Sequence, residues 1–173
     1  MTAQRGRGSW VLFGAVAVIA LARLATLGAY PLMDTTEARY AEIARKMAEL
    51  GDWTTPWFDY GVPFWGKPPL SFWLTAGSFR LLGVGEFAAR LPQWLAGMLV
   101  AWLLWQWLAR RSQREATYAL ALLLGSALYL VAAGAVMTDM ALAAGTTLAM
   151  RGFWLGIHGA GAERMRERWL RFA

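Results

Sequence analysis

The sequence predicts an all-α integral membrane protein with about four transmembrane helices and two juxtamembrane helices on the outer face. Apolar residues make up 58% of the 173 residues, and the mean hydropathy is +0.37. Soluble domains have roughly 45–50% apolar residues. Several apolar runs are long enough to cross a hydrocarbon core of about 30 Å. Short basic clusters flank these runs, as they do on the cytoplasmic side of membranes.

Composition also excludes some classes of function. The chain has no cysteine, so disulfides and thiolate chemistry are ruled out. Its net charge of +6 does not indicate a nucleic-acid partner, because the basic residues sit beside apolar runs. No P-loop, dinucleotide-binding, HExxH or CxxC motif is present.

The first predicted span covers residues 10–27 and follows Arg5 and Arg7. A cleaved signal peptide is the alternative. An uncleaved helix is favoured because the run is longer than a usual signal core and further spans follow. One charge interrupts the run, Arg23, which either reaches the headgroup region or faces a polar cavity.

Residues 34–50 predict an amphipathic helix that lies on the membrane surface. Its apolar positions recur every three or four residues, at Tyr40, Ile43, Met47 and Leu50. Its charged positions fall on the other side, at Arg39, Glu42, Lys46 and Glu49. Asp34 and Glu37 resemble a capping box at its start, and Gly51 is a typical residue just after its end.

Residues 52–66 predict an aromatic loop at headgroup level. Lys67-Pro68-Pro69 then opens a second helix, to about Leu82, which is short for a span. We expect this helix to be interfacial or shallowly re-entrant. The outer loop with its two helices therefore covers residues 34–86.

Three further spans are predicted at residues 91–109, 116–137 and 140–158. The N-terminus, the 110–114 turn and the 164–171 tail are basic, and an even number of spans separates each from the next. All three are therefore predicted to be cytoplasmic, which puts the 34–86 loop and Asp139 on the outer face. Arg151 lies inside the last span and should face a cavity or a partner, which helices outside this chain could supply.

The outer-face residues include two carboxylates and a cation that suit group transfer. Asp34 starts a helix, Lys67 precedes a rigid Pro-Pro step and Asp139 lies at the edge of a span. A carboxylate can act as general base, and a cation can stabilise a departing phosphate. Each residue also has a structural alternative, since the two aspartates can cap helices and Lys67 can anchor in the headgroups.

Four elements in order resemble the GT-C membrane glycosyltransferases, and among them the protein O-mannosyltransferase superfamily and its bacterial branch of lipid A aminoarabinose transferases. They are Asp34-x-x-Glu37-x-Arg39-Tyr40, Lys67-Pro68-Pro69-Leu70, Ala89-Arg90-Leu91-Pro92 and Thr138-Asp139. The resemblance covers nearly the whole chain. It implies transfer of a sugar from a polyprenyl phosphate to a lipid or protein acceptor, on the periplasmic face of the bacterial inner membrane and with inversion at the sugar carbon.

The resemblance also implies roles for single residues. Asp34 would be the leading catalytic carboxylate, acting as base toward the acceptor or orienting it, with Asp139 as a supporting acidic residue of the catalytic site. Lys67 would contact the donor phosphate. Glu37, Arg39 and Tyr40 would contribute to substrate binding.

Two departures from the family pattern matter. Gly66 stands where aminoarabinose transferases carry an acidic residue, which leaves the sugar and a divalent metal cofactor open. The family also has many more spans, so residues 1–173 are expected to be one membrane domain, the N-terminal fragment of a larger glycosyltransferase. The alternative function is a non-catalytic membrane scaffold or transporter subunit, but a transporter should concentrate its charges inside the spans.

Overall fold

The computed structural model describes residues 3–158, which form helices and one small hairpin. The elements in order are α1 (Ala3–Thr26), α2 (Thr35–Leu50), β1 (Trp57–Asp59), β2 (Val62–Pro63), α3 (Leu70–Leu82), α4 (Glu86–Ala109), α5 (Gln113–Gly125), α6 (Ala127–Ala132) and α7 (Asp139–His158). The predicted all-α class is confirmed. The basic tail at residues 164–171 lies outside the described residues.

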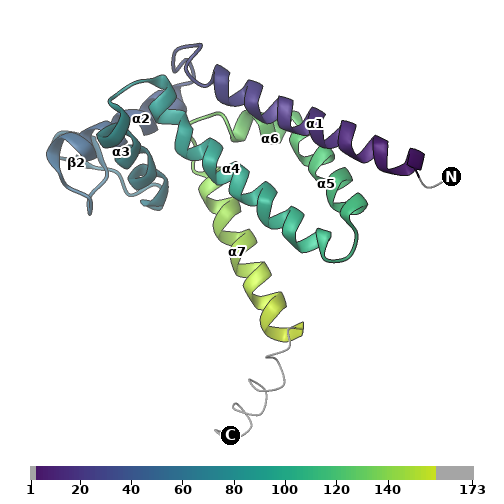
Figure 1. Cartoon of the computed structure of the whole chain (residues 1–173). Coiled ribbons are helices and arrows are strands. Elements are labelled where there is room, and N and C mark those ends of the chain that lie inside the picture. Colours follow the sequence, from purple (N-terminus) through teal and green to yellow (C-terminus); the bar gives the residue numbers. More distant parts are fainter. Residues whose placement is uncertain (1–2, 159–173) are drawn as a thin grey trace, which may run out of the picture.

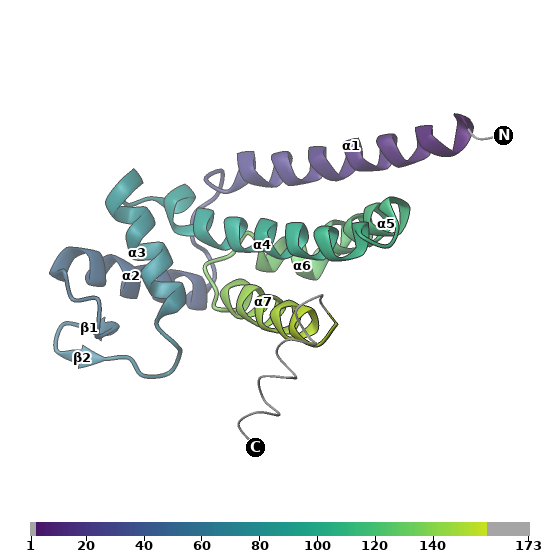
Figure 2. The ribbon, with the colours of Figure 1, turned by 60° about the horizontal axis from the view of Figure 1, so that its bottom comes forward.

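The helices are arranged in two parts (Figure 1). Helices α2 and α3 gather with the hairpin at one end, and α1, α4, α5 and α7 extend away from it. The turn between α4 and α5 lies at the far end, whereas the connection between α6 and α7 returns to the α2 end. Figure 2 shows the same separation from a second direction. The predicted outer-face elements therefore do lie together, opposite the turn that carries Arg110 and Arg111.

Two helices of the described chain, α4 and α7, are long and apolar enough to cross a membrane, and the apolar stretch Trp10–Thr26 of α1 is shorter. The predicted span 116–137 is not one helix. It breaks at Ser126, whose φ of −73° and ψ of 123° are extended, so α5 ends at Gly125 and α6 ends at Ala132. The span count of four is therefore not confirmed.

The short helix α6 packs closely against α4 at Gly97. A Cβ added to Gly97 would lie 2.9 Å from the Cβ of Ala133, so a larger residue would push the helices apart. The hydroxyl of Tyr129 donates a hydrogen bond to the Gly97 carbonyl. This contact brings the end of α6 next to the middle of α4.

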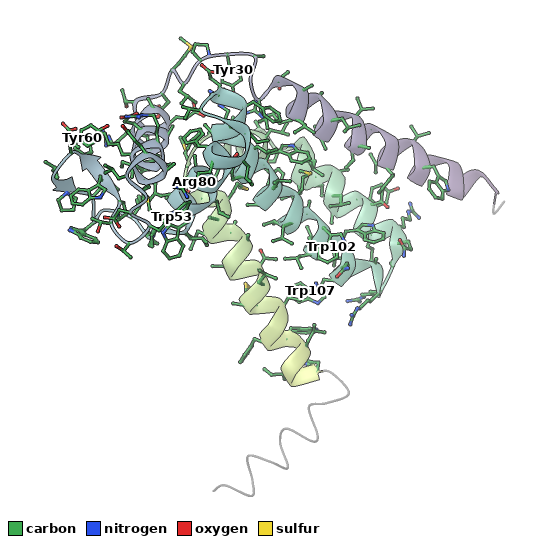
Figure 3. All side chains as sticks on the ribbon, turned by 60° about the vertical axis from the view of Figure 1, so that its left-hand side comes forward. Tyr30, Trp53, Tyr60, Arg80, Trp102 and Trp107 are labelled. Atoms are coloured by element: carbon green, nitrogen blue, oxygen red, sulfur yellow. The ribbon has the colours of Figure 1, made fainter. Side chains whose placement is uncertain are left out.

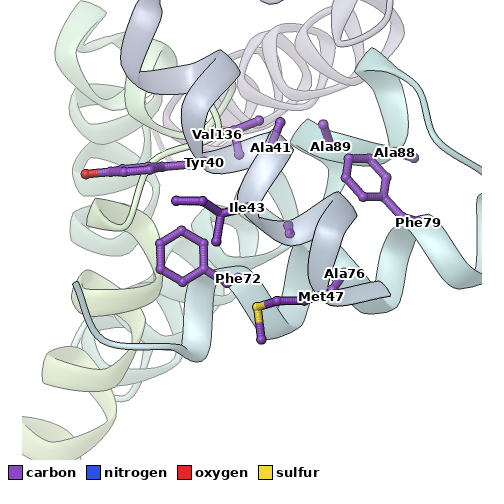
Figure 4. Packing of buried hydrophobic residues seen from close by; sticks show 11 residues of the cluster. Tyr40, Ala41, Ile43, Met47, Phe72, Ala76, Phe79, Ala88, Ala89 and Val136 are labelled. Atoms are coloured by element: carbon purple, nitrogen blue, oxygen red, sulfur yellow. The ribbon is translucent and has the colours of Figure 1, made fainter. Parts of the chain in front are cut away.

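The apolar stripe of α2 packs against other helices of this chain. The prediction that this stripe rests on the membrane surface is therefore wrong. Tyr40, Ile43 and Met47 are buried against Phe72 and Phe79 of α3, together with alanines of α4 (Figure 4). The Tyr40 and Phe72 rings meet edge to face, with centroids 5.5 Å apart. Leu50 is exposed. The stripe thus joins α2 to the membrane helices through α3 and α4.

The predicted aromatic loop contains an antiparallel hairpin, in which Trp57 pairs with Pro63 and Asp59 with Val62. Lys46, which the sequence places on the charged side of α2, is buried beneath this hairpin. Its ammonium donates to the Phe58 carbonyl at 2.9 Å and to Oδ1 of Asp59 at 3.0 Å. Tyr60 marks the hairpin in Figure 3, where Arg80 also lies close to Trp53. The contacts of Lys46 with Phe58 and Asp59 therefore help to order the hairpin, whose own sequence has no strong strand or turn pattern.

The arginine inside the last helix finds its partner within this chain. Nη2 of Arg151 on α7 donates to Oε1 of Gln106 on α4 at 2.7 Å. Pairing a charge across two apolar helices lowers the free-energy cost of placing it there. The expectation that Arg151 needs a partner is confirmed, but helices outside the chain are not required for it.

Candidate functional site

Asp34 caps α2 and remains accessible. Its Oδ1 accepts hydrogen bonds from the backbone N–H groups of Thr36 at 2.8 Å and Glu37 at 3.2 Å. These donors, Thr36 first, hold the pKa of the Asp34 carboxyl below its usual range. The side chain is exposed, and neither bond uses Oδ2. At neutral pH the carboxylate is therefore ionised and free to accept a proton or a hydrogen bond from a ligand.

Asp34 borders a cavity of about 640 Å³, which we call the first cavity. It lies between the α1–α2 connection and the segment that joins α6 to α7. Its lining residues are Arg23, Tyr30, Met33, Asp34, Glu37, Leu130, Val131, Ala135 and Met137. Most of these residues are apolar, and Arg23, Asp34 and Glu37 supply the charges.

Arg23 of α1 lines the first cavity, although most of the other lining residues are apolar. Its Nε donates to the Leu130 carbonyl at 3.1 Å and its Nη2 to the Tyr30 hydroxyl at 3.0 Å. The guanidinium lies directly on Gly134. A Cβ there would be 1.7 Å from Nη2, so only glycine leaves room for Arg23 in this position.

Lys67 and Asp139 line a second cavity, of about 410 Å³. Lys67 comes from the connection before α3, and Asp139 is the first residue of α7. Both side chains are exposed. The remaining lining residues are Pro68, Leu70, Ser71, Thr138, Ala141, Leu142, Gly145, Thr146 and Ala149.

The linings of the two cavities meet at one short segment of the chain. Met137 lines the first cavity, whereas Thr138 and Asp139 line the second. The Met137 carbonyl accepts a hydrogen bond from the Ser71 hydroxyl, which fixes this segment to α3. The structure thus brings Lys67 and Asp139 together and places Asp34 in the neighbouring cavity.

Residues 3–158 contain no group of three or more His, Cys, Asp or Glu side chains that could hold a metal ion. The carboxylates that line the two cavities can take or give a proton, and the cations there can stabilise an anion.

Comparison with known proteins identifies the family. Residues 9–173 match the family described as dolichyl-phosphate-mannose-protein mannosyltransferase. The chain belongs to this mannosyltransferase family. The resemblance to the protein O-mannosyltransferase superfamily is therefore confirmed.

Several bacterial proteins are similar to this chain. The undecaprenyl phosphate-alpha-4-amino-4-deoxy-L-arabinose arabinosyl transferase of Edwardsiella ictaluri is 36% identical over 135 residues, which are 76% of this chain and 24% of that protein. Crystal structures of ArnT from Cupriavidus metallidurans match in the apo state and bound to undecaprenyl phosphate. Their TM-scores are 0.76 and 0.77, at 31% and 30% identity, and they cover 95% and 92% of this chain. The chain spans 24–30% of the length of these proteins.

Three other residues of the mannosyltransferase motif lie in different surroundings. Glu37 is buried, and its carboxylate binds Arg90 instead of the Asp34 backbone, so the reciprocal half of the predicted capping box is wrong. Tyr40 is buried in the packing between α2 and α3. Arg39 is exposed, with its guanidinium 6.0 Å from the Phe58 ring centroid. Their roles in substrate binding stay predictions.

The glycine that departs from the aminoarabinose transferase pattern has a local structural role. A Cβ on Gly66 would lie 2.8 Å from Cζ of the Phe64 ring. An acidic side chain at this position would therefore require Phe64 to move. Phe64 in turn packs on Tyr40 and Phe72, so the glycine is linked to the packing of α2 and α3.

Sequence reasoning gave no role to Arg90 and Gly134. Arg90 is fully buried near the start of α4 and binds Glu37. Its position at the beginning of an apolar span was a usable signal, because a charge there needs a partner. Gly134 had no such signal, since only the packed structure shows that Arg23 covers it.

Proposed function

We propose that this chain is part of a glycosyltransferase that moves a sugar from a polyprenyl phosphate to a lipid or protein acceptor. The reaction would take place on the periplasmic face of the bacterial inner membrane, with the N-terminus in the cytoplasm. The names of the bacterial relatives and the ArnT structure with undecaprenyl phosphate support this proposal. Residues 1–173 would form one membrane domain in the N-terminal part of the longer enzyme. The family match favours an enzyme over a scaffold or transporter subunit.

The arrangement of the two cavities carries the proposal. Lys67 in the second cavity would bind the donor phosphate, because a cation stabilises the negative charge that develops as phosphate leaves. Asp34 in the first cavity would take the proton from the acceptor. Asp139 lines the second cavity together with Lys67 and would be a supporting acidic residue there.

This arrangement is suited to inversion at the sugar carbon. In a single displacement the acceptor attacks from the side opposite the leaving group. A base on one side and a group that stabilises the leaving phosphate on the other would provide what such a step needs; inverting glycosidases use a carboxylate base and a carboxylic acid in these two places. Asp34 and Lys67 line separate cavities whose linings meet at the 137–139 segment.

Binding of undecaprenyl phosphate tests the role of Lys67. A chimaera in which this chain replaces the matching 30% of Cupriavidus metallidurans ArnT supplies the rest of the enzyme. Lys67→Gln should weaken binding of undecaprenyl phosphate to the chimaera in nanodiscs by about 10- to 100-fold. A hydrogen bond to a charged group contributes about 1.5–3 kcal/mol, and about 1.4 kcal/mol changes an equilibrium tenfold.

Arg80→Gln is the matched control, because Arg80 is an exposed cation at the same end that packs on Trp53. This variant should bind the lipid as the unmodified chimaera does. Undecaprenol, which lacks the phosphate, should not distinguish Lys67→Gln from its parent. Unchanged affinity of Lys67→Gln for undecaprenyl phosphate would contradict the proposed donor site.

A further inference from the structure

Arg90 makes five hydrogen bonds in a fully buried position. Its Nε and Nη2 donate to the two carboxylate oxygens of Glu37, at 2.7 and 2.9 Å. Nη1 donates to the carbonyls of Leu27 and Tyr30, both at 2.7 Å, and Nη2 also donates to the Pro31 carbonyl at 3.0 Å. One side chain of α4 therefore binds both the α1–α2 connection and α2.

Glu37 extends these contacts to a fourth segment. Its Oε1 also accepts a hydrogen bond from the backbone N–H of Val136, at 3.1 Å. Val136 is buried and lies three residues before Asp139. We call the Arg90 and Glu37 side chains with these bonds the Arg90–Glu37 clamp.

The clamp holds the chain on both sides of Asp34, at Pro31 and at Glu37, and it holds the chain just before Asp139. One buried ion pair thus links the backbone beside Asp34 to the backbone just before Asp139. Such a pair is a poor device for stability alone, because apolar residues of similar size often stabilise a fold as well or better. Its directional bonds suit the fixing of geometry.

We infer that Arg90 and Glu37 are positioning residues that set where Asp34 stands relative to Asp139. This inference rests on the proposed function, because it assumes that the two carboxylates act together. Neither clamp residue needs to touch substrate. Both act through the backbone that carries the two aspartates.

Arg90→Lys is the main test, since it keeps the charge but offers three donors instead of a planar fork of five. Arg45→Lys is the matched control. Arg45 also forms a bidentate pair on α2, with Glu42 at 2.7 and 2.8 Å, but the pair is part exposed. Glu37→Gln is the second variant, which keeps an acceptor for Val136 and removes the charge.

Spin labels test the geometry without any activity measurement. The chain has no cysteine, so cysteines introduced at Ala38 on α2 and Met150 on α7, both exposed, are labelled selectively. Arg90→Lys and Glu37→Gln should broaden or shift the distance distribution between these labels, and Arg45→Lys should leave it unchanged. An unchanged distribution in either clamp variant that accumulates would overturn the inference.

Transfer kinetics in the ArnT chimaera test the consequence. Arg90→Lys should lower kcat by roughly 10- to 100-fold, because small displacements of reacting groups have effects of this order, while KM for the donor changes less than about twofold. Adding Asp34→Asn to Arg90→Lys should then cost less than in the parent, because both changes impair one step.

Equal effects of Asp34→Asn in both backgrounds, or an unchanged kcat in Arg90→Lys, would contradict the positioning role. An unmodified chimaera that lacks transfer would instead count against the proposed function. The label distances would still decide whether the clamp sets the geometry.

Discussion

Gly134→Ala should destabilise the protein through Arg23 alone. Gly134 does not have a positive φ, so alanine fits the backbone there. The added Cβ would lie 1.7–2.1 Å from three atoms of the guanidinium group, which must therefore move. Arg23 would lose its hydrogen bonds to the Leu130 carbonyl and the exposed Tyr30 hydroxyl.

The size of the effect follows from these bonds. The bond to Leu130 contributes about 1.5–3 kcal/mol, since the donor is charged, and we count nothing for the exposed bond to Tyr30. Alanine returns about 0.4–1 kcal/mol, because it restricts the unfolded chain. The net loss in the free energy of unfolding is about 0.5–2.5 kcal/mol, and each kcal/mol corresponds to about 2–4 °C in Tm.

Thermal unfolding in detergent measures this loss. Gly152→Ala on α7 is the control, because nothing lies within 4 Å of its added Cβ, and it should be neutral or stabilising by up to about 1 kcal/mol. In an Arg23→Ala background the cost of Gly134→Ala should disappear. Equal Tm values for Gly134→Ala and wild type, or the same cost without Arg23, would refute the reasoning.

Three further predictions concern the outer end of the molecule. In intact cells an impermeant thiol reagent should label a cysteine at Val62 in the hairpin but not one at Arg111 in the α4–α5 turn, and the reverse pattern would overturn the predicted orientation. Lys46→Met should make the hairpin more mobile, because the Phe58 carbonyl and Asp59 lose their hydrogen-bond partner. Proteolysis within residues 57–63 should then be faster than in wild type. Equal proteolysis rates would show that Lys46 does not hold the hairpin. Hydrogen bonds from Thr54, then from Thr55 and Trp57, hold the pKa of Asp52 well below its usual range. Its contribution to stability should therefore be complete above about pH 5 and be lost as pH falls from there through the folded pKa. Tryptophan fluorescence followed from pH 7 down to about pH 1 should show this loss in wild type and a smaller one in Asp52→Asn, and identical profiles would contradict it.

Local patterns predicted the parts of the fold that depend on neighbouring residues. The Asp34 cap and the end of α2 at Gly51, with φ of 69°, are set by the backbone next to them. The partner of Glu37 is 53 residues away, so a local pattern favoured the capping box instead. The hairpin depends in the same way on Lys46. The break at Ser126 did have a local signal, because Gly125 directly precedes it and helices often kink at Gly/Ser pairs.

The candidate site was predictable in its residues but not in its division into two cavities. Asp34, Lys67 and Asp139 came from motif and resemblance, and all three lie at the α2 end. The path of residues 133–138 decides which of these three residues share a cavity. Contacts with Ser71, Glu37 and Arg23, from three other segments, fix this path. Such long-range contacts leave no periodic signal in the sequence.

Sugar transfer by Asp34→Asn in the ArnT chimaera tests the central claim most directly. Asparagine caps a helix about as well as aspartate, so α2 and accumulation in the membrane should be preserved. An amide cannot take a proton at neutral pH, and losing a general base typically slows a reaction about 10²–10⁴-fold. We predict normal binding of undecaprenyl phosphate with transfer at least about a hundredfold slower. Transfer close to that of the unmodified chimaera would remove Asp34 from the mechanism and leave it as a helix cap.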